Sequence, residues 1–196
     1  RPPRSTPKPS SAASDVYKRQ KEMMLTGGSP TMHPALVNEL THFANERNII
    51  ITIETEGSAF VETDYPIGVI SLSPKFSNSV PVVGAITPAG KTVDERFVKV
   101  HNRHRLNTDS IKRMIAFHTD YHYKPVWDGT DKNLKEIEDY RVELNIPKDK
   151  TYIMPAGDTR DQLVKMYPLV FTMCAEHGYN MTGRDHIIAF NTERGV

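Results

Sequence analysis

Short apolar runs alternate along this chain with amphipathic stretches of helical period. The apolar runs are typical of buried strands and fall at residues 22–25, 49–53, 67–72, 121–127, 152–154 and 187–190. The amphipathic stretches predict helices over 34–48 and 108–119, from 131 to the break at Pro147, and from a cap at Asp158 or Thr159 to Gly178. About six strand–helix alternations predict an α/β fold with a parallel sheet, either flat or curled into a partial barrel.

The predicted helices carry stripes of positions that we expect to be buried. The stripes are Leu36, Val37, Leu40, Phe43 and Ala44; Ile111, Met114, Ile115 and His118, after a cap at Thr108 or Asp109; and Leu163, Met166, Tyr167, Val170, Phe171 and Cys174. Residues 76–107 show no period and hold prolines, glycines and a basic cluster, so we expect a lid or an inserted loop there.

Polar phrases follow the predicted strands at their carboxyl ends, where parallel α/β folds place their ligands. These phrases are TGGSPT (26–31), ETEGS (54–58), SLSPK (71–75) and MPAG (154–157). Gly27 and Gly28 permit a positive φ and leave backbone groups open to a carboxylate, an amine or a phosphate. An ordinary strand-to-helix turn is the alternative for the first phrase, and a solvated charge is the alternative for Lys75.

Composition narrows the classes of partner. The chain has 196 residues, the length of one domain, and its 25 basic and 24 acidic residues provide no strong field for a nucleic acid or an anionic membrane. No apolar run approaches the roughly 20 residues that span a bilayer. The single cysteine, Cys174, excludes an internal disulfide framework and lies on an apolar stripe, which favours a buried hydrophobe over a nucleophile. We therefore expect a cytoplasmic protein without a direct nucleic-acid or membrane partner.

The first twenty residues differ from the rest of the chain. They hold four prolines and few large apolar residues, so residues 1–20 are expected to form a disordered or non-native tail before a domain over 21–196. Residues 10–20 look like translated adapter sequence, and a basic transit peptide is the alternative.

Histidines raise a second possibility, a zinc site. Sets of the kind that zinc favours could form from His101, His104, His118, His122, Asp120 and His186. A solvated loop or a phosphate contact is the simpler interpretation of the first pair, and a helix C-terminus that of His118. Arg184 and His186 would share one side of the last predicted strand, which favours a polar site there or an exposed edge.

Taken in order, the segments TGGSPTMHP, IETEGS, SLSPK, YIMPAGDTRDQL, MYPLV and RDHIIAF resemble the 7-carboxy-7-deazaguanine synthase family of radical S-adenosylmethionine enzymes. The match runs from about residue 21 to 196. The resemblance implies a partial, six-stranded radical-enzyme barrel and a homodimer. It also implies a lyase reaction in queuosine and 7-deazapurine biosynthesis, in which 6-carboxy-5,6,7,8-tetrahydropterin contracts to 7-carboxy-7-deazaguanine with loss of ammonia. The implied cofactors are S-adenosylmethionine, a [4Fe-4S] cluster and Mg²⁺.

The resemblance assigns roles by matching position. The implied cofactor-binding residues are Thr26, Gly27, Gly28, Ser29, Thr55, Glu56, Ser71, Ser73, Lys75 and Met154. The implied residues near the pterin are Arg184, His186 and the tail that ends at Val196. Three positions depart from the family pattern: Ser29 replaces a glutamate, Glu56 the asparagine of a Thr-Asn pair, and Met154 a glutamine.

The largest departure concerns the cluster. The family holds it through three cysteines after the first strand, whereas this chain has Cys174 alone. We therefore expect an N-terminally truncated and inactive chain with no metal ligands of its own. The alternatives are a cluster-free module that binds S-adenosylmethionine or a pterin and acts through a partner, and a zinc hydrolase.

Overall fold

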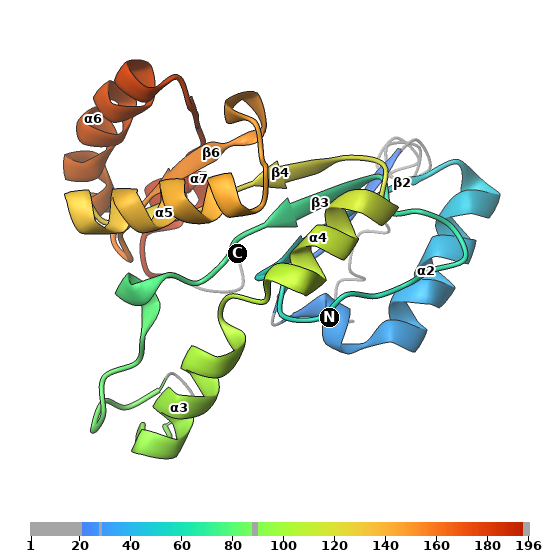
Figure 1. Ribbon diagram of the computed structural model, residues 1–196, viewed down its shortest axis with the longest axis horizontal. Helices are drawn as coiled ribbons and strands as arrows, with labels where there is room; N and C mark the ends of the chain where they lie inside the picture. The colour runs from blue at the N-terminus through green and yellow to red at the C-terminus, as the bar shows by residue number, and fades with distance from the viewer. Residues whose placement is uncertain (1–20, 28, 88–89, 194–196) are drawn as a thin grey trace, which may run out of the picture.

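The structure, a computed structural model, describes residues 21–27, 29–87 and 90–193. Within these residues all paired strands run parallel and form two sheets (Figure 1). The larger sheet has the order β1 (Glu22–Leu25), β2 (Ile50–Thr55), β3 (Val69–Leu72) and β4 (Tyr121–Tyr123). The smaller sheet has the order β5 (Val126–Trp127), β6 (Tyr152–Pro155) and β7 (Asn180–Met181). The predicted α/β class with parallel pairing is confirmed.

The two sheets meet where β4 gives way to β5. Lys124 and Pro125 separate these strands, and the amide of Met154 donates to the carbonyl of Pro125 at 2.9 Å. A single parallel bridge between Tyr123 and Thr151 also joins the sheets. The predicted strand over 121–127 is therefore interrupted, because proline has no amide hydrogen for the ladder.

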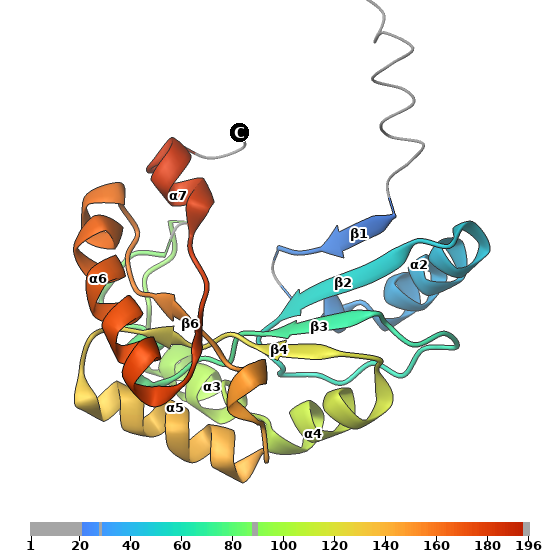
Figure 2. The ribbon, with the colours of Figure 1, turned by 90° about the horizontal axis from the view of Figure 1, so that it is seen from above.

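Helices cover one side of the strands. Figure 2 shows α4 and α5 on that side, whereas α7 lies toward the opposite side, which we call the open side. The helices are α2 (Pro34–Arg47), α3 (Glu95–His104), α4 (Thr108–Phe117), α5 (Asp131–Glu143), α6 (Arg160–His177) and α7 (Asp185–Phe190), with 3₁₀ turns η1 (Pro30–Met32), η2 (Ser77–Ser79) and η3 (Lys148–Lys150).

The hydrophobic core lies between the sheets and these helices. Ile53 and Leu72 on the strands and Ile111 on α4 are fully buried members of it. Because side chains alternate along a strand, the intervening positions Glu54 and Ser71, which are register partners, face the other side of the sheet, where Glu54 is half-buried and Ser71 is buried. This side therefore offers polar groups next to the strand ends.

The last long helix begins and ends where the sequence predicts. Thr159 caps α6 in a capping box with Gln162, and Gly178 ends it at a φ of 73°. The cap of α4 is different from the prediction: the side chain of Asn107, rather than Thr108 or Asp109, accepts from the amide of Ser110.

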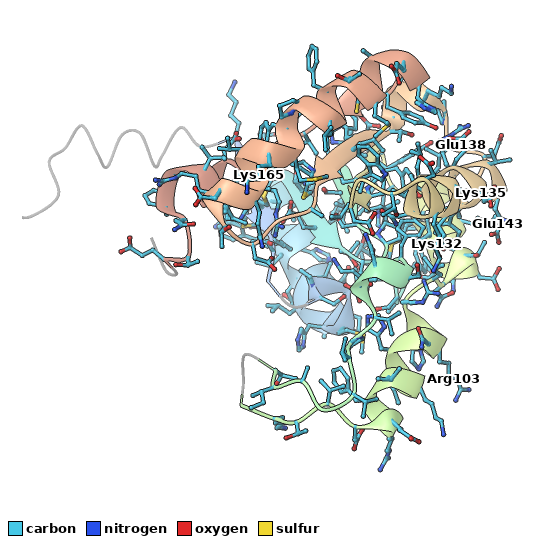
Figure 3. The ribbon with its side chains drawn as sticks, turned by 90° about the vertical axis from the view of Figure 1, so that its left-hand side faces the viewer. Arg103, Lys132, Lys135, Glu138, Glu143 and Lys165 are labelled. Carbon is cyan, nitrogen blue, oxygen red and sulfur yellow. The ribbon has the colours of Figure 1, made fainter. Side chains whose placement is uncertain are left out.

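The expectation of an irregular loop over 76–107 is wrong in part, because α3 lies inside it. Asp94 caps this helix by accepting from the amide of Phe97 at 2.6 Å. The helix buries no residue completely, and its large apolar residues are confined to Phe97, Val98 and Val100 among charged and polar neighbours, too few to suggest a packed helix. Figure 3 shows Arg103 of α3 apart from the layer that carries Lys132 and Lys165.

The strand predicted over 187–190 is wrong. These residues belong to α7, and the last strand is β7, which precedes them. A four-residue apolar run does not distinguish a strand from a short helix, and here only Ile187 is buried. Arg184 and His186 consequently lie at the start of a helix and do not alternate along a strand.

Three positions of the predicted stripes face solvent. Leu36 is 59% exposed, Phe43 42% and Phe171 68%. The guanidinium carbon of Arg47 lies 3.9 Å from the centre of the Phe43 ring, a contact that shields an outward-facing aromatic side chain. None of the helices in the described residues is both long and apolar enough to cross a membrane. The predicted tail over 1–20 lies outside the described residues.

Candidate functional site

The carboxyl ends of β1, β2 and β3 enclose a small polar cavity. Its volume is about 190 Å³, and its lining consists of Thr26, Gly27, Glu54, Thr55, Glu56, Ser73 and Lys75. Sites that enclose a whole drug-sized ligand have roughly 300–1,000 Å³. This cavity therefore fits a small charged group of a ligand and leaves the remainder of that ligand on the open side of the sheet.

Glu54 is held by side chains from both edges of the larger sheet. The hydroxyl of Thr26 donates to Oε2 at 2.9 Å, and the ammonium of Lys124 donates to Oε1 at 2.9 Å. Burial by itself raises the pKa of Glu54, but the hydrogen bond and charge of Lys124, the Thr26 hydroxyl and the charge of His186 together bring it below its ordinary value. Glu54 is thus kept ionised at neutral pH.

The loop after β1 brings its backbone to the cavity. Gly27 has a φ of 88°, in the region that favours glycine, and no atom lies within 4 Å of the place where a Cβ would be. Ser29 does not line the cavity: its hydroxyl lies 3.1 Å from that of Thr31, which in turn lies 3.3 Å from that of the lining residue Thr55. Gly28 lies outside the described residues.

The tip of β2 is fixed by a tight turn. Gly57 has a φ of 87°, and its amide donates to the hydroxyl of the buried Thr55 at 3.1 Å. A Cβ at Gly57 would lie 2.5 Å from Cγ1 of Ile111, so only glycine fits this turn without movement of the core. The turn carries Glu56, whose Oε1 accepts from the hydroxyl of Ser58.

Lys75 provides a positive charge on the opposite wall of the cavity. The guanidinium of Arg105 donates to the Lys75 carbonyl at 3.2 Å, and the amide of Ser73 donates to the Thr55 carbonyl at 2.8 Å. Burial of its ammonium lowers the pKa of Lys75, Glu56 and Glu54 oppose this effect, and Arg184 adds to it. Across residues 21–27, 29–87 and 90–193, Lys75 forms no ion pair.

The remaining residues assigned by resemblance lie outside this cavity. Ser71 is 3% exposed within β3, and its hydroxyl has no hydrogen-bond partner among the described residues. Met154 is half-buried on β6 in the smaller sheet. Arg184 donates to the carbonyl of Gly157 at 2.6 Å and acts electrostatically on Lys75, as His186 does on Glu54. Val196 lies outside the described residues.

Sequence reasoning missed two residues of the site, Glu54 and Lys124. Glu54 belongs to the ETEGS phrase, in which the resemblance assigns roles to Thr55 and Glu56 alone. Lys124 directly precedes the proline that ends β4, so a charge at a strand exit was the available signal. Their pairing can be predicted only when the strand order is known, because β3 lies between the strands that carry them.

The residues present do not fit an iron–sulfur cluster. Cys174 is buried on α6, where its thiol donates to the carbonyl of Asn180 at 3.4 Å, and burial raises its pKa to about 11. Cluster ligation needs several thiolates, and this chain has one cysteine. In the part of the chain that the structure describes, no three His, Cys, Asp or Glu side chains gather to hold a metal ion, so zinc finds no ligand set there.

The histidines considered for zinc have other surroundings. Nδ1 of His118 accepts from the amide of Ile67 at 3.2 Å, and burial lowers the pKa of His118 to about 4. The ring of His122 lies 4.8 Å from that of Tyr152, while His101 and His104 belong to the separate helix α3.

Comparison with known proteins gives two informative relatives. No protein-family model matches the chain. The chain is 31% identical over 176 residues to a 7-carboxy-7-deazaguanine synthase of Rhodopirellula baltica and 29% identical over 182 residues to one of Halobacterium salinarum. These matches cover 90% and 89% of this chain. The chain spans 64% of the length of the first relative and 67% of the second.

Proposed function

We infer from these two relatives that the chain belongs to the 7-carboxy-7-deazaguanine synthase family. We propose that its strand-tip cavity binds the amino-acid end of S-adenosylmethionine in such an enzyme. The observation that carries this proposal is the cavity itself, in which carboxylates and an ammonium surround a small volume at the ends of parallel strands. The proposed reaction of the whole enzyme is the contraction of 6-carboxy-5,6,7,8-tetrahydropterin to 7-carboxy-7-deazaguanine with loss of ammonia.

The chemistry of the cavity suits a zwitterion. A ligand ammonium has three donors and needs acceptors, which the carboxylates of Glu54 and Glu56 supply. A ligand carboxylate needs donors, which the Lys75 ammonium supplies at the opposite wall. In a whole enzyme that holds a reduced iron–sulfur cluster, S-adenosylmethionine would be the source of a 5′-deoxyadenosyl radical; the residues of this chain do not fit such a cluster. This chain's own residues would orient S-adenosylmethionine and keep its charged end away from water.

The open side of the larger sheet is the proposed place of the pterin. Arg184 and His186 enter this region from the start of α7 and act on the charges of Lys75 and Glu54. We propose that these two side chains contact the substrate. We also propose that the two sheets form part of a radical-enzyme barrel and that the protein works as a homodimer, which light scattering of the purified chain tests directly.

The chain as given is proposed to bind S-adenosylmethionine without turning it over. Its one thiol is buried and hydrogen-bonded, and it lies on α6 rather than near the cavity. Anaerobic reconstitution with iron and sulfide tests this point. We expect no cluster absorbance to survive desalting, and a stable, stoichiometric cluster would contradict the proposal.

Calorimetric titration of the chain with S-adenosylmethionine tests the binding site. We expect one site per chain and a loss of at least about tenfold in affinity for Lys75→Ala, since an ion pair with the ligand carboxylate would be lost. Lys132→Ala on α5 is the matched control and should leave the affinity unchanged (Figure 3). Absence of binding by the unmodified chain would refute the site, and binding that is insensitive to Lys75→Ala would place it elsewhere.

A further inference from the structure

Two opposite charges face the cavity without neutralising each other. Glu56 stands at the tip of β2 and Lys75 just beyond β3, and both line the same small volume. Neither forms an ion pair with any side chain that the structure describes. An α-amino acid end carries both a positive and a negative group, so it could pair with these two side chains at once.

The other acidic and polar groups nearby are already engaged. Both oxygens of Glu54 accept hydrogen bonds, one from Thr26 and one from Lys124. The hydroxyl of Ser29 is directed to Thr31 and carries no charge. In Glu56, by contrast, Oε1 accepts from Ser58 while Oε2 has no hydrogen-bond donor among the described residues. Glu56 therefore has more acceptor capacity left for a ligand than Glu54 has.

The position of Glu56 is rigid. The residue that follows it, Gly57, occupies a turn that the amide bond to Thr55 and the close approach of Ile111 hold in place. The hydroxyl of Ser58 fixes the orientation of the carboxylate itself. A binding group held in this way loses little conformational freedom when a ligand arrives.

We propose that Glu56 is the specificity-determining residue that reads the α-ammonium group of the ligand, so that this cavity selects nucleoside ligands with a zwitterionic amino-acid end. The inference rests on the proposed function, because it takes the ligand to be S-adenosylmethionine or a close analogue. It adds which residue provides the selection and why Ser29 does not.

A pair of related ligands isolates this contact. S-adenosylhomocysteine carries the amino-acid end, and 5′-methylthioadenosine shares its adenosine and thioether but lacks the charged end. Calorimetric titrations with both ligands would compare the unmodified chain with Glu56→Gln and Glu56→Asp. Glu62→Gln is the control, since Glu62 is exposed and lies 3.9 Å from Arg113, away from the cavity.

We expect Glu56→Gln to lower the affinity for S-adenosylhomocysteine by about tenfold, because a charge-assisted hydrogen bond is replaced by a neutral one. The affinity for 5′-methylthioadenosine should change less than about twofold. Glu56→Asp should recover part of the loss. A Glu56→Gln protein that binds S-adenosylhomocysteine like the unmodified chain would overturn the inference and leave the proposed function standing. Equal losses for both ligands would also overturn it. If the unmodified chain binds neither ligand, the proposed function itself fails.

Discussion

The ammonium of Lys124 lies 2.9 Å from Oε1 of Glu54, although the two residues are 70 positions apart in the chain and β3 runs between their strands. The side chain of Lys124 is 18% exposed and that of Glu54 is 38% exposed, so solvent screens the pair only in part. The contact ties the far edge of the larger sheet to the centre of the cavity. It also leaves Glu54 less able than Glu56 to accept further donors.

Replacement of Lys124 by methionine should destabilise the protein by about 1 kcal/mol at pH 7, the scale expected for a partly exposed ion pair. The folded-state pKa of Glu54 is lowered, so the stability that the pair contributes is present above the ordinary value of 4.5 and is lost as the pH falls through the lower folded value. Urea denaturation at pH 7 and pH 4 measures the difference. Lys132→Met on the exposed face of α5 is the control, and a penalty that does not shrink toward acid would argue against the pair.

His118 should make the protein sensitive to mild acid. Its pKa is lowered from 6.5 to about 4 because the ring is buried. Between these two pH values His118 is therefore protonated in the unfolded chain and neutral in the folded chain. Stability is therefore fully present above pH 6.5 and falls by up to about 3 kcal/mol as the pH drops to 4. The free energy of unfolding should depend less on pH for His118→Gln than for the unmodified protein. For His104→Gln on exposed α3, it should depend on pH as strongly as in the unmodified protein. Identical slopes for all three proteins would contradict the assignment.

Cys174 should be inert toward thiol reagents in the folded protein. With a pKa of about 11 its thiolate is scarce at pH 8, and the side chain is only 4% exposed. We expect reaction with Ellman's reagent to be at least about a hundredfold slower than in guanidinium chloride. A second cysteine placed at Val142, which is 60% exposed on α5, should react at once and serves as the internal standard. Rapid labelling of Cys174 would show that α6 opens readily.

Gly57 and Gly84 share a φ of 87°, but only Gly57 lacks room for a side chain. Alanine at Gly84 should cost about 1 kcal/mol from backbone strain alone, since nothing lies within 4 Å of the new methyl group. Alanine at Gly57 should cost at least about 1 kcal/mol more, because its Cβ meets the side chain of Ile111. Free energies of unfolding of the two variants measure the steric part by difference. Equal losses of unfolding free energy in the two variants would mean that the Ile111 side chain moves aside without an energetic cost.

The sequence foretells those elements whose signals are local. The helix from Thr159 to Gly178 carries a capping box at one end and a left-handed glycine at the other, and both signals lie within a few residues. Helix α3 escapes prediction because it is short, rich in charged residues and buries no side chain completely, so few apolar positions mark it in the sequence. The apolar run at 187–190 is too short for its composition to choose between helix and strand.

Some residues of the candidate site could likewise be predicted from local sequence signals, and others could not. Thr26, Gly27, Thr55, Glu56, Ser73 and Lys75 follow strand ends and could be named from the chain alone. The role of Lys124 could not, because it depends on which strands are neighbours and on how far a side chain reaches across β3. The hydroxyl of Ser29 contacts that of Thr31, and this contact also depends on the three-dimensional path of the loop.

Pro125 stands where one sheet ends and the other begins, and it has no amide hydrogen to offer to either. A break in the ladder at this point consequently loses no hydrogen bond from a backbone amide. At a non-proline residue of a continuous strand, the same break would leave a buried amide without an acceptor. The break between the two sheets, next to Lys124, therefore coincides with the one kind of residue whose backbone offers no donor. Any other amino acid at this position would bring an amide hydrogen that needs an acceptor of its own.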